Sequence, residues 1–174
     1  ASGASAATLN VGPGETFTTI NSAINAANAG DTINVSFGVY NESVFVNKSL
    51  TLVGVGEKPT LTGNGANFIL KVENTNSVVL DNFEINGGDA NSFEYGVLVN
   101  LSGSQSSPVE LKNLKIKNIW NNGANAVGVE SGSFIVMHDN TLNFFHKNGV
   151  RFVNSKGAVY NNTITGDTVD GSNR

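Results

Sequence analysis

A short motif recurs along this chain at intervals of 22 to 31 residues, and it constrains the fold more than any other feature. Each copy begins with an apolar residue, has Asn or Asp two positions later, and ends with Ile or Leu five positions after the first. A weaker copy begins at Leu52, 28 positions before the first full one. Repeats of this length, built of short strands with a polar residue at a fixed corner, are typical of β-solenoids. The four full copies are Leu80–Ile85, Leu111–Ile116, Met137–Leu142 and Val159–Ile164.

The polar residue of the motif marks a tight corner between two strands. The four corner residues are Asn82, Asn113, Asp139 and Asn161. Asn tolerates the left-handed conformation that such corners need, and stacked Asn side chains can form an amide ladder between coils. Asp139 breaks that ladder, so it either accepts hydrogen bonds from its two neighbours or turns outward.

The chain after Gly30 consists of strands of three to five residues separated by turn clusters. Alternate residues of each strand should face inward, so that Val97, Val127 and Val150 stack in one row. We therefore predict an all-β fold, a parallel β-helix of about five coils with three short strands each. The predicted strands are 32–35, 43–46 and 50–53 in the first coil, then 68–72, 78–80 and 83–85, then 95–99, 109–111 and 114–116, then 127–129, 134–137 and 141–143, and finally 149–152, 158–160 and 163–165.

One amphipathic helix precedes the coils and follows a first short strand at residues 8–11. Thr18 or Thr19 can cap its start, and Gly30 should end it. A helix with one apolar stripe must cover something, and the open end of the solenoid is its natural target. We expect a single domain over 1–174, with the strand and cap helix in 8–31, coils in 32–165 and an uncapped tail in 166–174. The apolar stripe consists of Ile20, Ala23, Ile24 and Ala27.

Composition excludes several classes of protein. Charged residues make up 14% of the 174 residues and the net charge is −4, which gives no basic face for nucleic acid. The chain has no Cys and no apolar run long enough to cross a membrane. Low charge and many uncharged polar residues favour an extracellular or cell-surface location. Glycosylation is left open by five Asn-X-Ser/Thr sequons, at Asn34, Asn41, Asn47, Asn100 and Asn161.

Three segments near the N-terminus carry a family signature: residues 17–33, Gly38-Val-Tyr-Asn-Glu42 and Lys48-Ser-Leu-Thr-Leu52. Together they resemble the N-terminal cap and first coil of the pectin-lyase-like right-handed β-helix superfamily, with Phe37 where that family usually has Pro. The repeats from residue 78 onward are similar to the NosD-type repeats of secreted and surface proteins. The resemblance implies the right-handed fold. It leaves activity open, because this superfamily hosts lyases, hydrolases, esterases, tail spikes, adhesins and surface-layer modules.

The catalytic signatures that this resemblance implies are missing. A Ca²⁺-dependent lyase needs clustered carboxylates, whereas the acids here are scattered. The paired Asp, Gly-His-Gly and Arg-x-Lys of the polygalacturonases do not occur. A pectin esterase would need paired Asp flanked by Gln, and the only Gln is Gln105, in a predicted loop. In the cap segment, Asp31 and Glu42 are interpreted as structural residues of turns.

A polar cluster near the C-terminus supplies the remaining candidates. Arg151 should point outward because its neighbours favour the interior, and Gly128, one coil earlier, could leave a shallow groove beside it. Weak catalytic candidates are Arg151, His146 and Asp139; ligand-binding candidates are Arg151, His146 and Trp120, which could contact an acidic sugar. Asp167 and Asp170 loosely resemble a Ca²⁺ loop, and no other cofactor is expected. The alternative is that all of these, with His138, are unrelated polar residues on a solvated face and that Trp120 packs over the core.

The sequence after Thr165 contains no amphipathic segment that could cover the last coil. We therefore expect either a longer parent solenoid or a second chain at this end. The primary hypothesis is a secreted or cell-surface β-helix module with a structural, adhesive or glycan-contacting role, self-assembling into a filament or surface layer. The alternative is a polysaccharide lyase or glycoside hydrolase of the superfamily, or a fragment of one.

Overall fold

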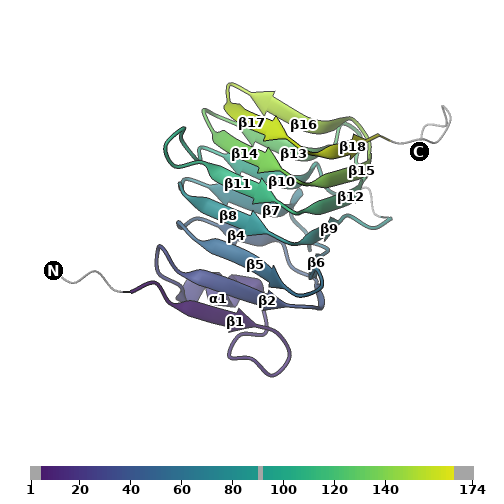
Figure 1. The fold of residues 1–174 in the computed structure, drawn as a ribbon. Helices are drawn as coiled ribbons and strands as arrows, with labels where there is room; N and C mark the ends of the chain where they lie inside the picture. The colour runs from purple at the N-terminus through teal and green to yellow at the C-terminus, as the bar shows by residue number, and fades with distance from the viewer. Residues whose placement is uncertain (1–4, 90–91, 167–174) are drawn as a thin grey trace.

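The chain winds into one parallel β-solenoid in a computed structural model that describes residues 5–89 and 92–166 (Figure 1). Strands of neighbouring turns pair in parallel, so three sheets run along the rod. Five turns each contribute one strand to every sheet, β1 precedes them, and β17 and β18 begin a sixth turn. The predicted all-β parallel β-helix is confirmed.

The three sheets differ in length. The first sheet contains, in spatial order, β1 (Thr8–Val11), β2 (Thr32–Ser36), β5 (Thr51–Val55), β8 (Val78–Asp81), β11 (Val109–Lys112), β14 (Phe134–His138) and β17 (Lys156–Tyr160). The second contains β3 (Val39–Tyr40), β6 (Thr60–Leu61), β9 (Glu84–Asn86), β12 (Lys115–Ile119), β15 (Thr141–Phe145) and β18 (Thr163–Thr165). The third contains β4 (Val44–Val46), β7 (Phe68–Glu73), β10 (Tyr95–Asn100), β13 (Asn125–Glu130) and β16 (Asn148–Val153).

The first predicted coil was assembled incorrectly. Residues 50–53 do not complete the coil that starts at 32–35, because β5 lies directly beside β2, with Leu52 opposite Ile33. The two-residue strands β3 and β6 supply the second sheet in these turns, and the sequence analysis missed both. Two residues are too few to show an alternating pattern, and Gly38 and Pro59 beside them read as turns.

The repeat identified in the sequence corresponds to one row of inward side chains. Leu52 stands opposite Leu80, Leu80 opposite Leu111, and Leu111 opposite Met137, and all four are buried. The predicted row of Val97, Val127 and Val150 is also present. Because each inward residue contacts its counterparts one turn above and below, the hydrophobic core is continuous along the rod.

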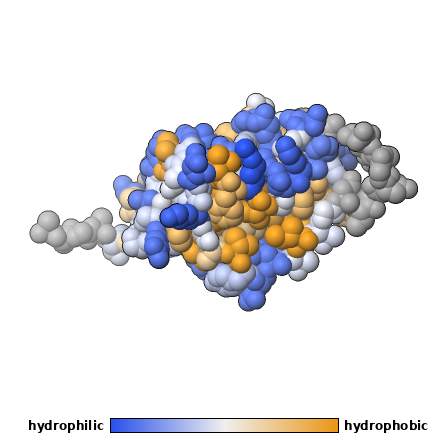
Figure 2. Space-filling model, turned by 90° about the horizontal axis from the view of Figure 1, so that it is seen from above, coloured by the Kyte–Doolittle hydropathy of each residue, from blue (hydrophilic) through white to orange (hydrophobic). Residues whose placement is uncertain are grey.

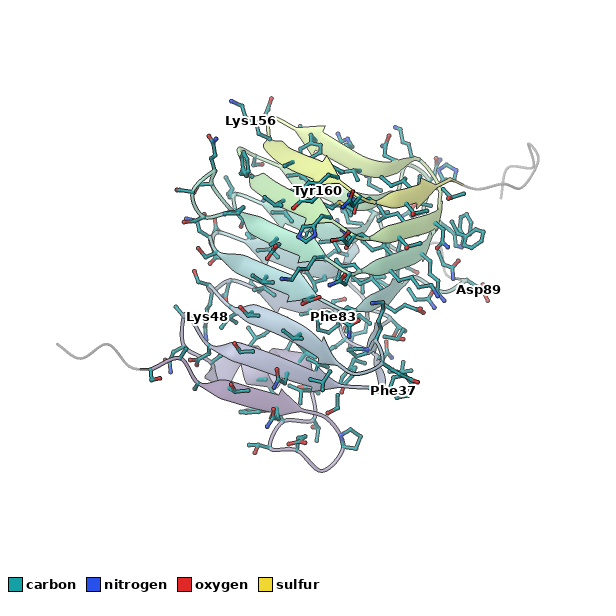
Figure 3. All side chains as sticks on the ribbon, viewed as in Figure 1. Phe37, Lys48, Phe83, Asp89, Lys156 and Tyr160 are labelled. Atoms are coloured by element: carbon teal, nitrogen blue, oxygen red, sulfur yellow. The ribbon has the colours of Figure 1, made fainter. Side chains whose placement is uncertain are left out.

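The helix α1 (Ile20–Ala26) covers the N-terminal end of the solenoid, as predicted, and buries Ile20, Ala23 and Ile24. It ends at Ala26, four residues before the expected stop at Gly30. Lys48, which lies in the next turn (Figure 3), explains this end: its ammonium group donates to the carbonyls of Ile24, Asn25 and Ala27 at 2.8–3.0 Å.

Two carboxylates bind backbone N–H groups around the same helix. Glu42 accepts from the N–H groups of Ile20 and Asn21 at 2.7 and 3.0 Å, and so caps the first turn of α1. Asp31 accepts from Ala7 and Asn28 at 2.8 and 2.7 Å. Both residues therefore have the structural role expected for them.

The corner residues of the repeat are left-handed, with φ of 66° at Asn82, 53° at Asn113, 57° at Asp139 and 53° at Asn161. Their hydrogen bonds differ from a simple ladder. Asn82 donates to the carbonyls of Gly54 and Gly56, Asn113 donates to Asp81, and Asp139 turns outward to His138.

The amide-to-amide contact lies one residue later in the corner, at Asn140 and Asn162. Asn140 donates to the Asn162 side-chain oxygen at 2.8 Å and accepts from the Leu114 N–H at 2.8 Å. The equivalent residues in the two preceding turns are the buried apolar residues Phe83 and Leu114. The inner corner position therefore changes from apolar to amide as the chain approaches its last turns.

Candidate functional site

The outer face of the third sheet carries a network around Arg151. Its guanidinium donates to Glu130 at 2.9 Å, and the same Glu130 oxygen accepts from the Tyr95 hydroxyl at 2.9 Å. A Cβ atom at Gly128 would lie 2.5 Å from the Tyr95 ring, so the absence of a side chain there makes room for the ring. The space expected at Gly128 is thus filled by the Tyr95 ring.

The surroundings of Tyr95 keep its phenol protonated. Burial and the hydrogen bond to Glu130 raise the pKa of the Tyr95 phenol above its usual value. Tyr95 therefore stays a hydrogen-bond donor at neutral pH, and Glu130 acts as the shared acceptor.

An open groove of about 230 Å³ lies beside this network. Amide groups line its floor: Asn148 donates to Asn125 at 2.6 Å, and Asn125 donates to the carbonyl of Gly123. The groove thus combines two cations, one carboxylate, amides and an aromatic ring, which is a suitable lining for a polar, acidic ligand. Its lining residues are Glu94, Tyr95, Asn122, Gly123, Asn125, Lys147, Asn148 and Arg151. We refer to it as the Arg151 groove.

Of two further predicted residues, His146 contacts the Arg151 groove and Trp120 packs elsewhere. His146 accepts a hydrogen bond from the N–H of Gly123, a groove residue, at 3.2 Å. Trp120 packs against Phe144, with ring centroids 6.4 Å apart and planes tilted by 43°. His146 therefore holds the 121–124 segment that forms one wall, while Trp120 contacts another aromatic ring.

The structure separates the remaining candidates from Arg151. His138 and Asp139 belong to the first sheet and its corner, not to the third sheet. His138 lies 2.6 Å from Asp139 and 3.0 Å from Glu110, and its ring stacks on Tyr160. The hydrogen bond to Glu110, and to a lesser extent the hydrogen bond to Asp139, raises the pKa of the His138 imidazole. Arg151 and Asp139 thus do not share a site, while Asp167 and Asp170 lie outside the described residues.

The carboxylates on the strands are engaged by basic side chains. No group of three or more His, Cys, Asp or Glu residues that could hold a metal ion occurs within residues 5–89 and 92–166. No acid stands opposite another acid in the register of neighbouring strands in this part of the chain. The arrangement suits ion pairing within strands and between turns better than acid–base chemistry. The ion pairs are Lys71–Glu73, Lys112–Asp81, Lys112–Glu110, Lys115–Glu84, Lys117–Glu84 and Arg151–Glu130.

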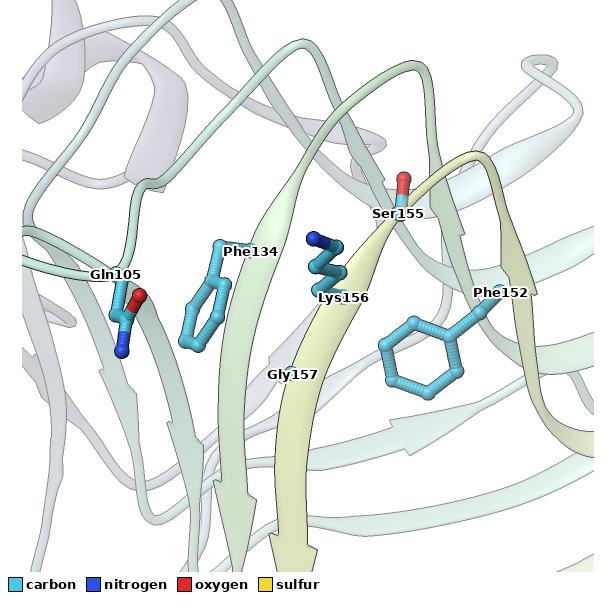
Figure 4. A pocket seen from close by; sticks show the side chains of 6 residues that line it. All are labelled: Gln105, Phe134, Phe152, Ser155, Lys156 and Gly157. Carbon is cyan, nitrogen blue, oxygen red and sulfur yellow. The ribbon is translucent and has the colours of Figure 1, made fainter.

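A second hollow, of about 550 Å³, was missed by the sequence analysis. Figure 4 shows Gln105 and Phe134 on one side of Lys156 and Phe152 on the other. It forms where the loop containing Gln105 approaches Phe152, Lys156 and Gly157 of the last turns. The position of Gln105 in a loop is as expected, but sequence spacing gives no indication of where that loop folds.

Comparison with known proteins supports the fold. No protein-family model matches the chain, and no match is found among curated proteins. Among solved structures, pectin methylesterase PemA from Erwinia chrysanthemi is similar with a TM-score of 0.57 and 18% identity, over 90% of this chain and 56% of that protein. Pectin methylesterase from Aspergillus niger is similar with a TM-score of 0.45 and 14% identity, over 99% of this chain and 89% of that one.

The likeness to PemA shows the fold: the chain is a β-solenoid with the pectin-lyase-like right-handed β-helix fold. The chain spans a little over half of PemA. At 18% identity the similarity shows the fold alone, so function rests on the site described above. No helix in the described residues is long and apolar enough to cross a membrane.

Proposed function

We propose that this chain is an extracellular or cell-surface glycan-contacting module that binds an acidic polysaccharide in the Arg151 groove without cleaving it. The observation that supports this most is the alignment of an oriented guanidinium, a tyrosine and stacked amides along one open groove. Pectin, the substrate class in the names of the two structural neighbours, is an acidic polysaccharide and the first ligand to test.

The chemistry of Arg151 fits a carboxylate ligand. Glu130 occupies one of its terminal nitrogens, Nη1, and fixes the direction of the side chain. A guanidinium has five N–H donors in a rigid fork, so others remain for a uronate carboxylate. The Lys147 ammonium in the same groove adds a second positive charge.

The amides suit the rest of a sugar. Asn125 and Asn148 lie opposite one another in neighbouring strands and present donors and acceptors at the groove floor. Sugar hydroxyls both donate and accept, so stacked amides can bind them in either sense. Neighbouring strands lie about 4.8 Å apart, and the next residue in this row is Tyr95, so two amides and an aromatic ring follow one another along the rod.

The alternative, a polysaccharide lyase or glycoside hydrolase, needs free acid and base groups. Glu130, which lies beside the groove, accepts from both Arg151 and Tyr95. Glu94, the carboxylate that lines the groove, accepts from the Asn67 amide at 3.0 Å. Binding without cleavage is therefore the better supported function.

Polygalacturonate binding tests the proposal. Arg151→Gln should weaken binding at low salt about 10-fold or more, because one charge-assisted hydrogen bond contributes about 1.5–3 kcal/mol. Lys112→Gln is the matched control, since it removes one cation from an ion pair on the first sheet. A neutral polysaccharide should bind neither variant nor the parent chain measurably.

The same samples decide between the two functions. Equal affinity of Arg151→Gln and Lys112→Gln would contradict a site at the Arg151 groove. Release of reducing ends or unsaturated products by the parent chain, with or without Ca²⁺, would replace the binding module by the enzymatic alternative.

A further inference from the structure

The chain contains four Asn-Gly pairs, which begin at residues 64, 86, 122 and 148. Asparagine is chemically labile in this context, because the backbone nitrogen that follows it can attack its side-chain amide carbon. A following glycine has no side chain to hinder this attack. The reaction needs an asparagine amide that is free to turn and a glycine nitrogen that can lose its proton. The four pairs differ in how well they meet these two conditions.

Three of the pairs have an asparagine side chain that is held by the fold. The side-chain oxygen of Asn64 accepts from the N–H of Ser43 at 3.0 Å. The side-chain oxygen of Asn86 accepts from the N–H two residues later, also at 3.0 Å. The Asn148 side chain donates to Asn125 at 2.6 Å, within the paired strands β16 and β13. Each of these amides is therefore kept in one orientation.

The remaining pair, Asn122 and Gly123, lies in an open turn. The Ala124 N–H donates to the Asn121 carbonyl at 2.7 Å, so the pair occupies the two central positions of the turn. Gly123 has a φ of 89°, as the second central position of such a turn requires. The Asn122 side chain is exposed, and no hydrogen bond joins it to another residue within 5–89 and 92–166. Its amide is therefore free to turn toward the next backbone nitrogen.

An imidazole contacts the nitrogen that would attack. The Gly123 N–H donates to Nδ1 of His146 at 3.2 Å, so a lone pair of the ring points at the amide proton. A positioned imidazole within hydrogen-bond reach of the proton that it removes has the geometry of a general base. The second histidine of the chain, His138, contacts two carboxylates on the first sheet instead. Gly123 is thus the glycine of these pairs that a histidine contacts.

We propose that Asn122 is a self-modification site, at which His146 promotes attack of the Gly123 nitrogen on the Asn122 side chain. Nδ1 of His146 takes the amide proton, a bond forms from the Gly123 nitrogen to Cγ of Asn122, and the bond from Cγ to Nδ2 breaks. The amino group leaves with that proton as ammonia, and the product is a cyclic succinimide. Water then opens the ring to aspartate or isoaspartate, and no atom is oxidised or reduced. The water comes from the solvent: Asn122 is exposed, and the view along the rod shows hydrophilic residues around much of its outline (Figure 2).

The modification changes the charge of the Arg151 groove. Asn122 and Gly123 line this groove together with Lys147 and Arg151. A carboxylate at position 122 places a negative charge in the same groove as these two cations, and isoaspartate also lengthens the backbone of the wall by one carbon. An acidic ligand should then bind more weakly. This effect on binding rests on the proposed function, whereas the modification itself does not.

Peptide mapping by mass spectrometry tests the modification without any ligand. The folded chain is incubated in neutral buffer, and conversion of asparagine to aspartate or isoaspartate is followed at all four pairs. We expect Asn122 to react at least about 10-fold faster than Asn64, Asn86 and Asn148. In the urea-unfolded chain the four pairs should react at similar rates, since each asparagine is followed by glycine. Equal rates in the folded chain, or faster conversion at another pair, overturn the proposal.

Replacement of His146 separates the base from the exposure of the turn. His146→Gln keeps a side chain that can accept from the Gly123 N–H but cannot take up its proton, so conversion of Asn122 should slow about 10-fold or more. His138→Gln is the matched control, because it removes the other imidazole of the chain from the first sheet and should leave the rate at Asn122 unchanged. An unchanged or faster rate in His146→Gln overturns the proposal.

The effect on the groove is measured with a variant that carries the charge of the product. Asn122→Asp should weaken polygalacturonate binding at low salt roughly 2- to 5-fold, as expected for one exposed pair of charges. Asn64→Asp is the matched control, since it adds the same charge at an Asn-Gly pair outside the groove and should bind like the parent chain. Equal affinity of the two variants would contradict the effect on binding, while the mass measurement decides separately on the modification.

Discussion

Replacing Asn140 with alanine should destabilise the solenoid far more than the same change three residues later. Asn140 is almost fully buried, and its side chain accepts from the Leu114 N–H and donates to the Leu111 carbonyl and the Asn162 side chain. In Asn140→Ala the Leu114 N–H remains buried without its partner. Asn143 is the matched control, because its side-chain oxygen is buried and has no hydrogen-bond partner among the described residues.

The magnitude follows from the hydrogen bonds. An orphaned buried N–H costs about 1–3 kcal/mol, and each lost hydrogen bond contributes about 0.5–1.5 kcal/mol more. We therefore expect Asn140→Ala to lower the free energy of unfolding by about 2–5 kcal/mol, and the midpoint temperature by roughly 5–15 °C. In Asn143→Ala no donor loses its acceptor, because the Asn143 side-chain oxygen has none among the described residues to begin with. The free energy of unfolding should therefore change by no more than about 1 kcal/mol.

Urea unfolding followed by circular dichroism, together with thermal melts, measures both variants against the parent chain. The reasoning is refuted if Asn140→Ala is as stable as Asn143→Ala, because the inner corner amide would then contribute nothing that an apolar residue cannot replace.

Three further predictions concern the core, a corner and a histidine. Leu111→Ala should cost about 2–5 kcal/mol in chemical denaturation and Leu111→Met less than about 1.5 kcal/mol, since only alanine leaves a cavity; equal losses would contradict this. Gly54→Ala places a Cβ against the Asn82 carbonyl oxygen, so it should lower the free energy of unfolding by about 1–3 kcal/mol, and an unchanged melting temperature would show that the corner can move to accept it. The pKa of His138 is raised in the folded state, so the charged imidazole contributes about 0.2–1 kcal/mol to the free energy of unfolding. This contribution is complete below pH 6.5 and is lost as the pH rises through the folded-state pKa. The stability difference between the parent chain and His138→Gln should therefore shrink toward alkaline pH, and a constant difference would exclude ionisation of the pair with Glu110.

The core rows could be predicted because they are repeated. Leu80 and Leu111 stand opposite one another in the structure as their motif positions require. The strands β3 and β6 could not be predicted, because two residues carry no period. Asn140 was missed for a related reason. Its counterpart one turn earlier is Leu114, so no residue type recurs from turn to turn at the inner corner.

The candidate site shows a second limit. Alternation along β16 places Arg151 on the outer face. Its partner Glu130 lies 21 positions earlier, and Tyr95, which also binds Glu130, lies a further 35 positions earlier, so only the register between turns brings the three together. His138 was grouped with Arg151 because both lie near the C-terminus. A solenoid has three faces, and closeness in sequence does not tell which face a residue occupies.

The side chains that bind the two ends of α1 make the N-terminal end of the rod more resistant to force than the turns that follow it. Lys48 and Glu42 reach back to the helix from residues 21 to 24 positions further along the chain, so the cap is fastened by the turn that follows it. A force applied along the rod should therefore separate the other turns, one after another, before the turn that holds α1. Single-molecule pulling would then show a series of short steps in which the helix is the final element to yield.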